Sequence, residues 1–112
     1  MKYIIDYYNE DVEREILELP DGLLARYIRL TEIMQVSGPN LGMPHVRPMG
    51  EGLYELRLKG KEGIARVFYC KVVKNTITML NVFIKKTEKT PKKYLDRACD
   101  RLRKIKNGGN LK

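Results

Sequence analysis

Residues 53–84 read LYELRLKGKEGIARVFYCKVVKNTITMLNVFI, and this stretch decides the fold. It holds three runs rich in the β-branched and aromatic residues that strands prefer, at 53–59, 64–73 and 76–84. Gly60-Lys61-Glu62-Gly63 separates the first two runs, and Lys74-Asn75 marks a tight turn before the third. Because such short connections join neighbouring strands, the three runs predict an antiparallel meander.

The sequence before the meander predicts a strand, two helices and a loop. Residues 2–8 are rich in Ile and Tyr, which favours a strand, and Asn9 can cap a helix that Pro20 ends. Asp21 can cap a second helix, which runs to about Val36 with apolar residues at helical spacing. Residues 37–52 contain so many Gly and Pro residues that we expect a loop there, without a regular element.

A last helix is expected after the meander. Thr90-Pro91 suits its start, with threonine as the cap and proline at the first helical position, and Asn107-Gly108 suits its end. The predicted order is β-α-α-β-β-β-α, an α+β domain in which helices cover one face of a mostly antiparallel sheet and leave the other face free for binding. The length of 112 residues fits one domain over 1–106, with 107–112 as a flexible tail.

Basic residues are concentrated in the second half of the chain. Residues 1–50 hold 5 Lys/Arg and 8 Asp/Glu, whereas residues 51–112 hold 17 Lys/Arg and 6 Asp/Glu. A cationic field of this kind attracts polyanions, of which nucleic acid is the commonest in the cytoplasm. The alternative is that the lysines only keep a small domain soluble. No apolar run suits a membrane span or a signal peptide, so we expect a cytoplasmic protein without a membrane partner.

Several kinds of catalytic site find no support in the sequence. His45 is the only histidine, and a structural or exposed role is the commoner one for a histidine in a Gly/Pro-rich loop. Cys70 and Cys99 are not spaced as a metal or redox pair, and we expect both to be buried. No P-loop occurs, and no serine or cysteine lies beside a candidate base. We therefore expect a reaction that needs no metal and no cofactor.

RNA cleavage is compatible with arginine, lysine and tyrosine because the substrate supplies the nucleophile. The ribose 2′-hydroxyl attacks the adjacent phosphorus, and the protein orients the strand, stabilises the phosphate charge and assists two proton transfers. Period-two alternation puts Arg57 and Lys59 on the polar face of their strand, whereas the mixed pattern around Arg66 leaves its direction open. Tyr69 is a candidate proton relay, and a lysine crowded by other cations is a candidate base.

A cluster of lysines follows the last predicted strand and leads into the last helix. A strand end beside a helix N-terminus suits phosphate, although a lysine pair seen alone is more often solvated surface. The candidate catalytic residues are Arg57, Arg66, Tyr69, Lys85 and Lys86. The candidate RNA-binding residues are Lys59, Lys71, Lys89, Lys92 and Lys93.

Three segments, in this order and spacing, resemble the RelE/ParE toxin superfamily in its HigB-like, phage-derived branch. They are Gly52-Leu53-Tyr54-Glu55-Leu56-Arg57, Ala65-Arg66-Val67-Phe68-Tyr69 and the run from Phe83 to Pro91, followed by Ala98 and Arg101. The resemblance covers about residues 17–102 and implies the RelE-like fold. It also implies the toxin of a type II toxin-antitoxin system, which cuts messenger RNA, commonly on the ribosome, and is inhibited by a cognate antitoxin, often a helix-turn-helix protein of the HigA kind.

The resemblance also bears on individual residues. By position it assigns Arg57, Arg66 and the lysines Lys85, Lys86 and Lys89 to the active face of the toxin, and so it implies a direction for Arg66. Asn81-Val82 departs from the histidine and glycine that relatives often have there, which weakens any mechanism that requires a histidine at this point.

Two other functions remain open at this stage. A ParE-like member would share the fold but poison DNA gyrase by binding it, and the Lys-Lys-Thr-Glu-Lys-Thr-Pro run at 85–91 argues against this reading. A non-catalytic RNA-binding or ribosome-binding module would show strong salt dependence and would tolerate the loss of one arginine, because each phosphate contact is a small part of such an interface.

Overall fold

The computed structural model describes residues 2–86 and 89–108. Within these residues the elements follow one another as β1 (Ile4–Tyr7), α1 (Glu10–Leu17), α2 (Asp21–Ser37), β2 (Val46–Gly50), β3 (Leu53–Gly60), β4 (Gly63–Cys70), β5 (Thr76–Lys85) and α3 (Lys92–Lys106). Residues 107 and 108 form a turn after α3, and the remainder of the predicted tail, 109–112, lies outside the described residues. None of the described helices combines the length and the apolar character needed to cross a bilayer.

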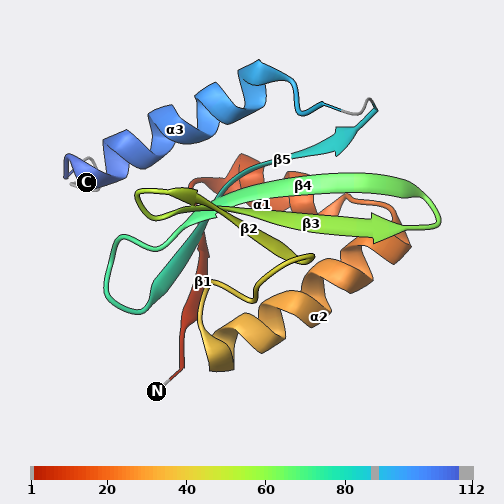
Figure 1. Ribbon diagram of the computed structural model, residues 1–112, viewed down its shortest axis with the longest axis horizontal. Coiled ribbons are helices and arrows are strands. Elements are labelled where there is room, and N and C mark those ends of the chain that lie inside the picture. Colours follow the sequence, from red (N-terminus) through yellow and green to blue (C-terminus); the bar gives the residue numbers. More distant parts are fainter. Residues whose placement is uncertain (1, 87–88, 109–112) are drawn as a thin grey trace.

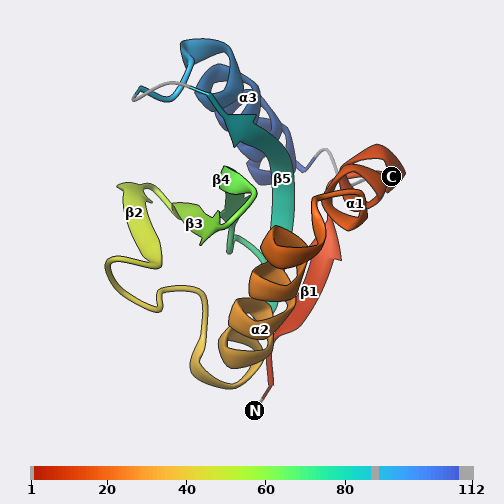
Figure 2. The same ribbon diagram turned by 90° about the vertical axis from the view of Figure 1, so that its right-hand side faces the viewer.

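The strands form one sheet in the order β1-β5-β4-β3-β2 (Figure 1). β1 pairs parallel to β5, and the other neighbours pair antiparallel, with the tight β3–β4 and β4–β5 connections that the sequence predicts. Helices α1 and α2 lie on one side of this sheet and α3 on the other (Figure 2). The predicted α+β class with a mostly antiparallel sheet is confirmed.

The central strand β4 is buried on both faces, and this separates two apolar cores. Ala65, Val67 and Tyr69 belong to the core under α1 and α2. Phe68 and Cys70 point the other way and pack against α3. The expectation that the helices leave one face free is therefore wrong for this part of the sheet, because its second face is apolar too and would be costly to expose.

Helix α3 covers that second face through its own apolar side chains. Ala98 and Leu102 are buried against the sheet. At the start of the helix, the ring of Tyr94 stacks on Phe83 of β5 with centroids 4.2 Å apart. The helix therefore lies across β4 and β5. It leaves uncovered the end of β3 and the start of β4, which pair with each other.

Strand β2 lies inside the segment that the sequence predicted to be a loop. It is an edge strand that pairs only with β3, through Val46 opposite Leu56 and Arg47 opposite Glu55. Proline is tolerated at an edge because a strand there needs ladder bonds on one side only, and the register shifts just after Pro48. The high density of Gly and Pro residues thus marks an irregular edge strand, and the order becomes β-α-α-β-β-β-β-α.

The helix starts agree with the sequence in part. Asn9 caps α1 as predicted, since its Oδ1 accepts a hydrogen bond of 2.9 Å from the backbone of Val12. Pro20 and Pro91 occupy the cap positions of α2 and α3 without a side-chain cap, so the predicted caps at Asp21 and Thr90 are wrong. The fixed φ of proline already suits entry into a helix.

The two cysteines differ in exposure, which corrects the expectation that both are buried. Cys70 is buried between β4 and α3, and Cys99 is exposed because Ala98 and Leu102 take the sheet-facing side of that helix. Burial raises the pKa of the Cys70 thiol to about 11.

The native protein should therefore show one reactive thiol. At pH 8, Cys70 stays protonated and covered, so a disulfide reagent should modify Cys99 alone, and both cysteines should react once urea unfolds the chain. The Cys99→Ser variant should remove the fast reaction in the native state. Rapid labelling of this variant without denaturant would contradict the packing of α3 on β4.

Candidate functional site

A cleft of about 430 Å³ opens where α3 leaves the sheet uncovered. Its floor comes from β3 and β4, and its walls come from β2, the end of β5 and the start of α3. The lining includes five basic residues and one acidic residue: Arg47, Arg57, Arg66, Lys85, Lys89 and Glu55. The cleft is thus strongly cationic.

Strand pairing brings the two arginines of the cleft floor together. Arg57 of β3 lies directly opposite Arg66 of β4 in the antiparallel ladder, and partners in such a ladder project to the same face. The direction of Arg66, which alternation within its own strand left open, is therefore fixed by its neighbour in the sheet. Lys85 belongs to β5, which pairs with the other edge of β4, and it lies opposite Ile64.

Glu55 compensates the charge of these two arginines. Its Oε2 lies 3.8 Å from Nε of Arg66, and its Oε1 lies 3.9 Å from Nε of Arg57. The side chains of Glu55 and Arg66 are each 6% exposed, whereas that of Arg57 is 33% exposed. Arg66 is therefore the inner cation of the cluster, and Arg57 is the one that a ligand can reach.

Burial lowers the pKa of the Arg66 guanidinium, Arg57 lowers it further, and the carboxylate of Glu55 opposes both effects. An arginine so placed still keeps its charge because guanidinium is an extremely weak acid. Glu55 was not among the sequence-predicted site residues. The available signal was a carboxylate two positions before Arg57, on the same face of an otherwise apolar strand.

The predicted lysines fall into two groups. Lys85 and Lys89 line the cleft, and Lys86 is exposed next to Lys85 at the end of β5. Lys92 and Lys93 lie in the first turn of α3 and contact their own helix: Lys92 pairs with Asp96 at 2.9 Å, and the Lys93 ammonium lies 5.1 Å from the centre of the Tyr94 ring. Neither of these two lines the cleft.

Lys59 and Lys71 lie at opposite ends of the hairpin. Lys59 is on the same face of β3 as Arg57 and lines, together with Arg57 and Arg66, a pocket of about 390 Å³ beside the cleft. Lys71 follows the last residue of β4, where its N–H donates to the carbonyl of Gly52, at the end of the sheet away from the arginines. The structure therefore does not bring Lys71 to the predicted site.

Tyr69 is not part of the cleft, which corrects the hypothesis that it relays a proton. It is fully buried on the opposite face of β4, under α1 and α2, where its ring stacks on Tyr54. Its hydroxyl donates to the carbonyl oxygen of Pro39, and burial raises its pKa. The sheet itself separates this hydroxyl from Arg57 and Arg66. Tyr69 instead anchors the segment between α2 and β2.

The cleft has the chemistry of a phosphate site. Two guanidinium groups on neighbouring strands, with lysines on the wall, present many N–H donors to an anion in a partly desolvated place. In the part of the chain that the structure describes, no three His, Cys, Asp or Glu side chains are grouped so as to hold a metal ion.

The fold defines the structural class of this chain, which is RelE-like. The structure aligns with a chain from the crystal structure of the archaeal RelE-RelB complex from Pyrococcus horikoshii OT3, with a TM-score of 0.50 and 19% sequence identity, over 75% of this chain and 96% of that chain. The chain belongs to the family described as Phage derived protein Gp49-like (DUF891), whose model matches residues 14–103. No curated protein sequence matches it significantly.

These comparisons confirm the RelE-like fold and the phage-derived family that the sequence indicates. The range that matches the family model contains every residue named for the cleft and the three sequence segments that carry the resemblance. The fold shared with the archaeal RelE agrees with that resemblance.

Replacing Glu55 should destabilise the protein. We expect Glu55→Gln to lower the free energy of unfolding by about 2 kcal/mol, because the amide leaves the buried Arg66 charge uncompensated. Urea unfolding measures the effect. The matched control is Asp11→Asn, which removes the exposed Asp11–Arg14 pair and should leave the midpoint nearly unchanged. Equal midpoints for the two variants would show that Glu55 does not compensate a buried charge.

Removing only the hydroxyl of Tyr69 should separate a structural role from a catalytic one. Tyr69→Phe keeps the stacked ring and loses the bond to Pro39, so we expect a loss of about 1 kcal/mol of stability and unchanged activity below the unfolding temperature. Thermal unfolding, and mapping of RNA 5′ ends after the chain is induced in a bacterium, provide the two measurements. A large loss of activity in a folded Tyr69→Phe protein would restore the proton-relay hypothesis.

Proposed function

We propose that this chain is the toxin of a type II toxin-antitoxin pair and that it cleaves messenger RNA as a metal-independent endoribonuclease. The observation that carries the proposal is the pair of cross-strand arginines, Arg57 and Arg66, held by Glu55 on the floor of a lysine-walled cleft. The RelE-like fold and the Gp49-like family support it.

The chemistry begins with an RNA phosphodiester bound in the cleft. Its 2′-oxygen attacks the adjacent phosphorus, the bond from phosphorus to the 5′-oxygen of the next nucleotide breaks, and the products are a 2′,3′-cyclic phosphate and a 5′-hydroxyl. Arg57 donates to the phosphate oxygens as negative charge accumulates on them, and Arg66 adds its charge from below. Glu55 positions both guanidinium groups.

Two proton transfers accompany these bond changes. One proton leaves the 2′-hydroxyl, and one reaches the departing 5′-oxygen. With Tyr69 on the other face, we assign this work to the lysines at the cleft wall, with Lys85 the foremost candidate and Lys86 beside it. Lys89 and Lys59 are proposed as contacts to the RNA backbone on either side.

The proposed partners follow from the same assignment. The similar archaeal RelE was solved as a complex with RelB, which supports an antitoxin partner for this chain. We propose a helix-turn-helix antitoxin of the HigA kind, messenger RNA as substrate, and the cytoplasmic ribosome as the place where cleavage occurs.

Induction of the chain in a bacterium, with mapping of RNA 5′ ends, tests the proposal. We expect growth arrest and new 5′ ends within messenger RNA, and a fall in cleavage of about 100-fold for Arg57→Ala, since one donor to the developing charge is lost. Lys71→Ala is the matched control because that cation lies away from the cleft, and it should cleave normally. Urea midpoints check that both variants fold.

Each other outcome excludes the proposal in a different way. Normal growth and no new 5′ ends with the wild-type chain would refute it. Growth arrest with intact messenger RNA and altered DNA topology would point to a gyrase poison. RNA binding without cleavage, only slightly weakened by Arg57→Ala, would indicate a non-catalytic binding module.

A further inference from the structure

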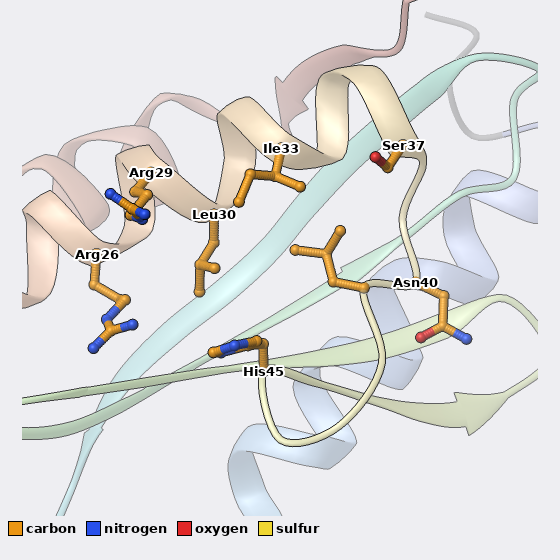
Figure 3. A pocket seen from close by; sticks show the side chains of 8 residues that line it. Arg26, Arg29, Leu30, Ile33, Ser37, Asn40 and His45 are labelled. Atoms are coloured by element: carbon orange, nitrogen blue, oxygen red, sulfur yellow. The ribbon is translucent and has the colours of Figure 1, made fainter.

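A second cationic pocket lies between α2 and the segment that leads into β2. Its volume is about 510 Å³, and its wall includes Arg26, Arg29, Leu30, Ile33, Leu41 and His45. Figure 3 shows Arg26, Leu30 and Ile33 extending from α2 on one side of this space, with His45 on the other. The pocket thus combines guanidinium groups with an apolar and aromatic wall.

The positive charges of the two arginines of this pocket are not paired with a carboxylate among the described residues. They are three residues apart on one helix, where like charges repel. Among the residues that the structure describes, neither lies within ion-pair distance of a carboxylate, whereas Arg14 and Arg103 both pair with an aspartate. None of the described residues that line the pocket is acidic. An anion bound there would relieve the repulsion between Arg26 and Arg29.

Shared lining residues link this pocket to the arginine cleft. A third pocket of about 390 Å³ shares Arg26 and His45 with the second pocket, and Arg57 and Arg66 with the cleft, and Lys59 lines it as well. It lies at the end of β3 beyond Arg57, which β2 leaves uncovered because the pairing of β2 begins with Val46 opposite Leu56. An extended ligand that followed these shared residues from the cleft to α2 would lie over cationic side chains.

Backbone hydrogen bonds hold His45 beside the cleft. Its carbonyl accepts the N–H of Arg57 at 2.8 Å, and its own N–H donates to Gly42 at 3.1 Å. The bond from Tyr69 to Pro39 anchors the preceding part of the segment. These bonds fix the backbone of His45, and its side chain lies across the pocket from Leu30 (Figure 3).

A pocket that combines guanidinium groups with an imidazole and apolar side chains suits one nucleotide of single-stranded RNA. Proteins bind single-stranded RNA by stacking unpaired bases on aromatic side chains while basic side chains contact the phosphates, and a duplex cannot offer its bases in this way. We propose that the Arg26–Arg29–His45 pocket binds a nucleotide of single-stranded RNA that lies several positions along the strand from the phosphate held in the cleft. This inference rests on the proposed function in taking RNA as the ligand and the cleft as the place where an RNA phosphate is held.

Binding of RNA oligonucleotides of two lengths tests the inference. The probes are single strands of about three and about eight nucleotides with 2′-O-methyl groups, which prevent cleavage, and fluorescence anisotropy at fixed salt gives the affinities. The wild-type chain should bind the longer strand more tightly. Arg26→Ala/Arg29→Ala should weaken binding of the longer strand about tenfold and leave the shorter one unchanged, since only the longer strand reaches α2.

Two further variants make the test specific. His45→Ala should weaken the longer strand by a similar factor through the loss of stacking. Arg14→Ala removes an arginine of α1 that pairs with Asp11, away from the pockets, and should change neither affinity. Urea midpoints establish that each variant is folded.

The outcomes separate this inference from the proposed function. A length-dependent loss in the Arg26/Arg29 variant supports the pocket even if the wild-type chain cleaves nothing in cells. An equal loss for both lengths, no loss for the longer strand, or no binding of either strand by the wild-type chain would overturn the inference, even if cleavage in cells is observed.

Discussion

The burial of Arg66 in the central strand is the constraint on which the other features depend. A cation in the middle of a two-sided core requires a carboxylate nearby, and Glu55 on the neighbouring strand supplies it at 3.8 Å. The same carboxylate approaches Arg57, so one buried anion orders two cations of which only the outer is accessible. The geometry of the cleft is therefore fixed by the sheet itself, and no flexible loop is needed to arrange the arginines.

Helix α3 divides the face of the sheet on which this cluster lies. Over Phe68 and Cys70 the surface is apolar and the helix covers it, whereas toward Arg57 and Arg66 it is charged and left open. The division follows the sequence of β4, which places an arginine and then a phenylalanine on the same face. Helix α3 thus completes the second apolar core and still leaves the charged part of β3 and β4 open to a ligand.

The sequence predicted those parts of the structure that local patterns determine. Alternation in β3 was regular enough to place Arg57, and the short turns predicted the meander. The direction of Arg66 needed the pairing with β3, because both faces of β4 are buried and its own pattern is mixed. The same ambiguity misplaced Tyr69. β2 was missed because Pro48 is compatible with a strand only at an edge, and edge position is a property of the assembled sheet.

The irregular β2 has a consequence for how other chains can approach the sheet. Unpaired edge strands invite the addition of further strands, and proteins protect them with short length, proline or a bulge. Here one edge is β1, with four residues, and the other contains Pro48 and a register shift. An extended peptide therefore finds no long continuous ladder to extend at either side. A protein that binds this chain tightly has to use side-chain surfaces, such as helix faces or the cleft, and association of the sheets edge to edge is discouraged.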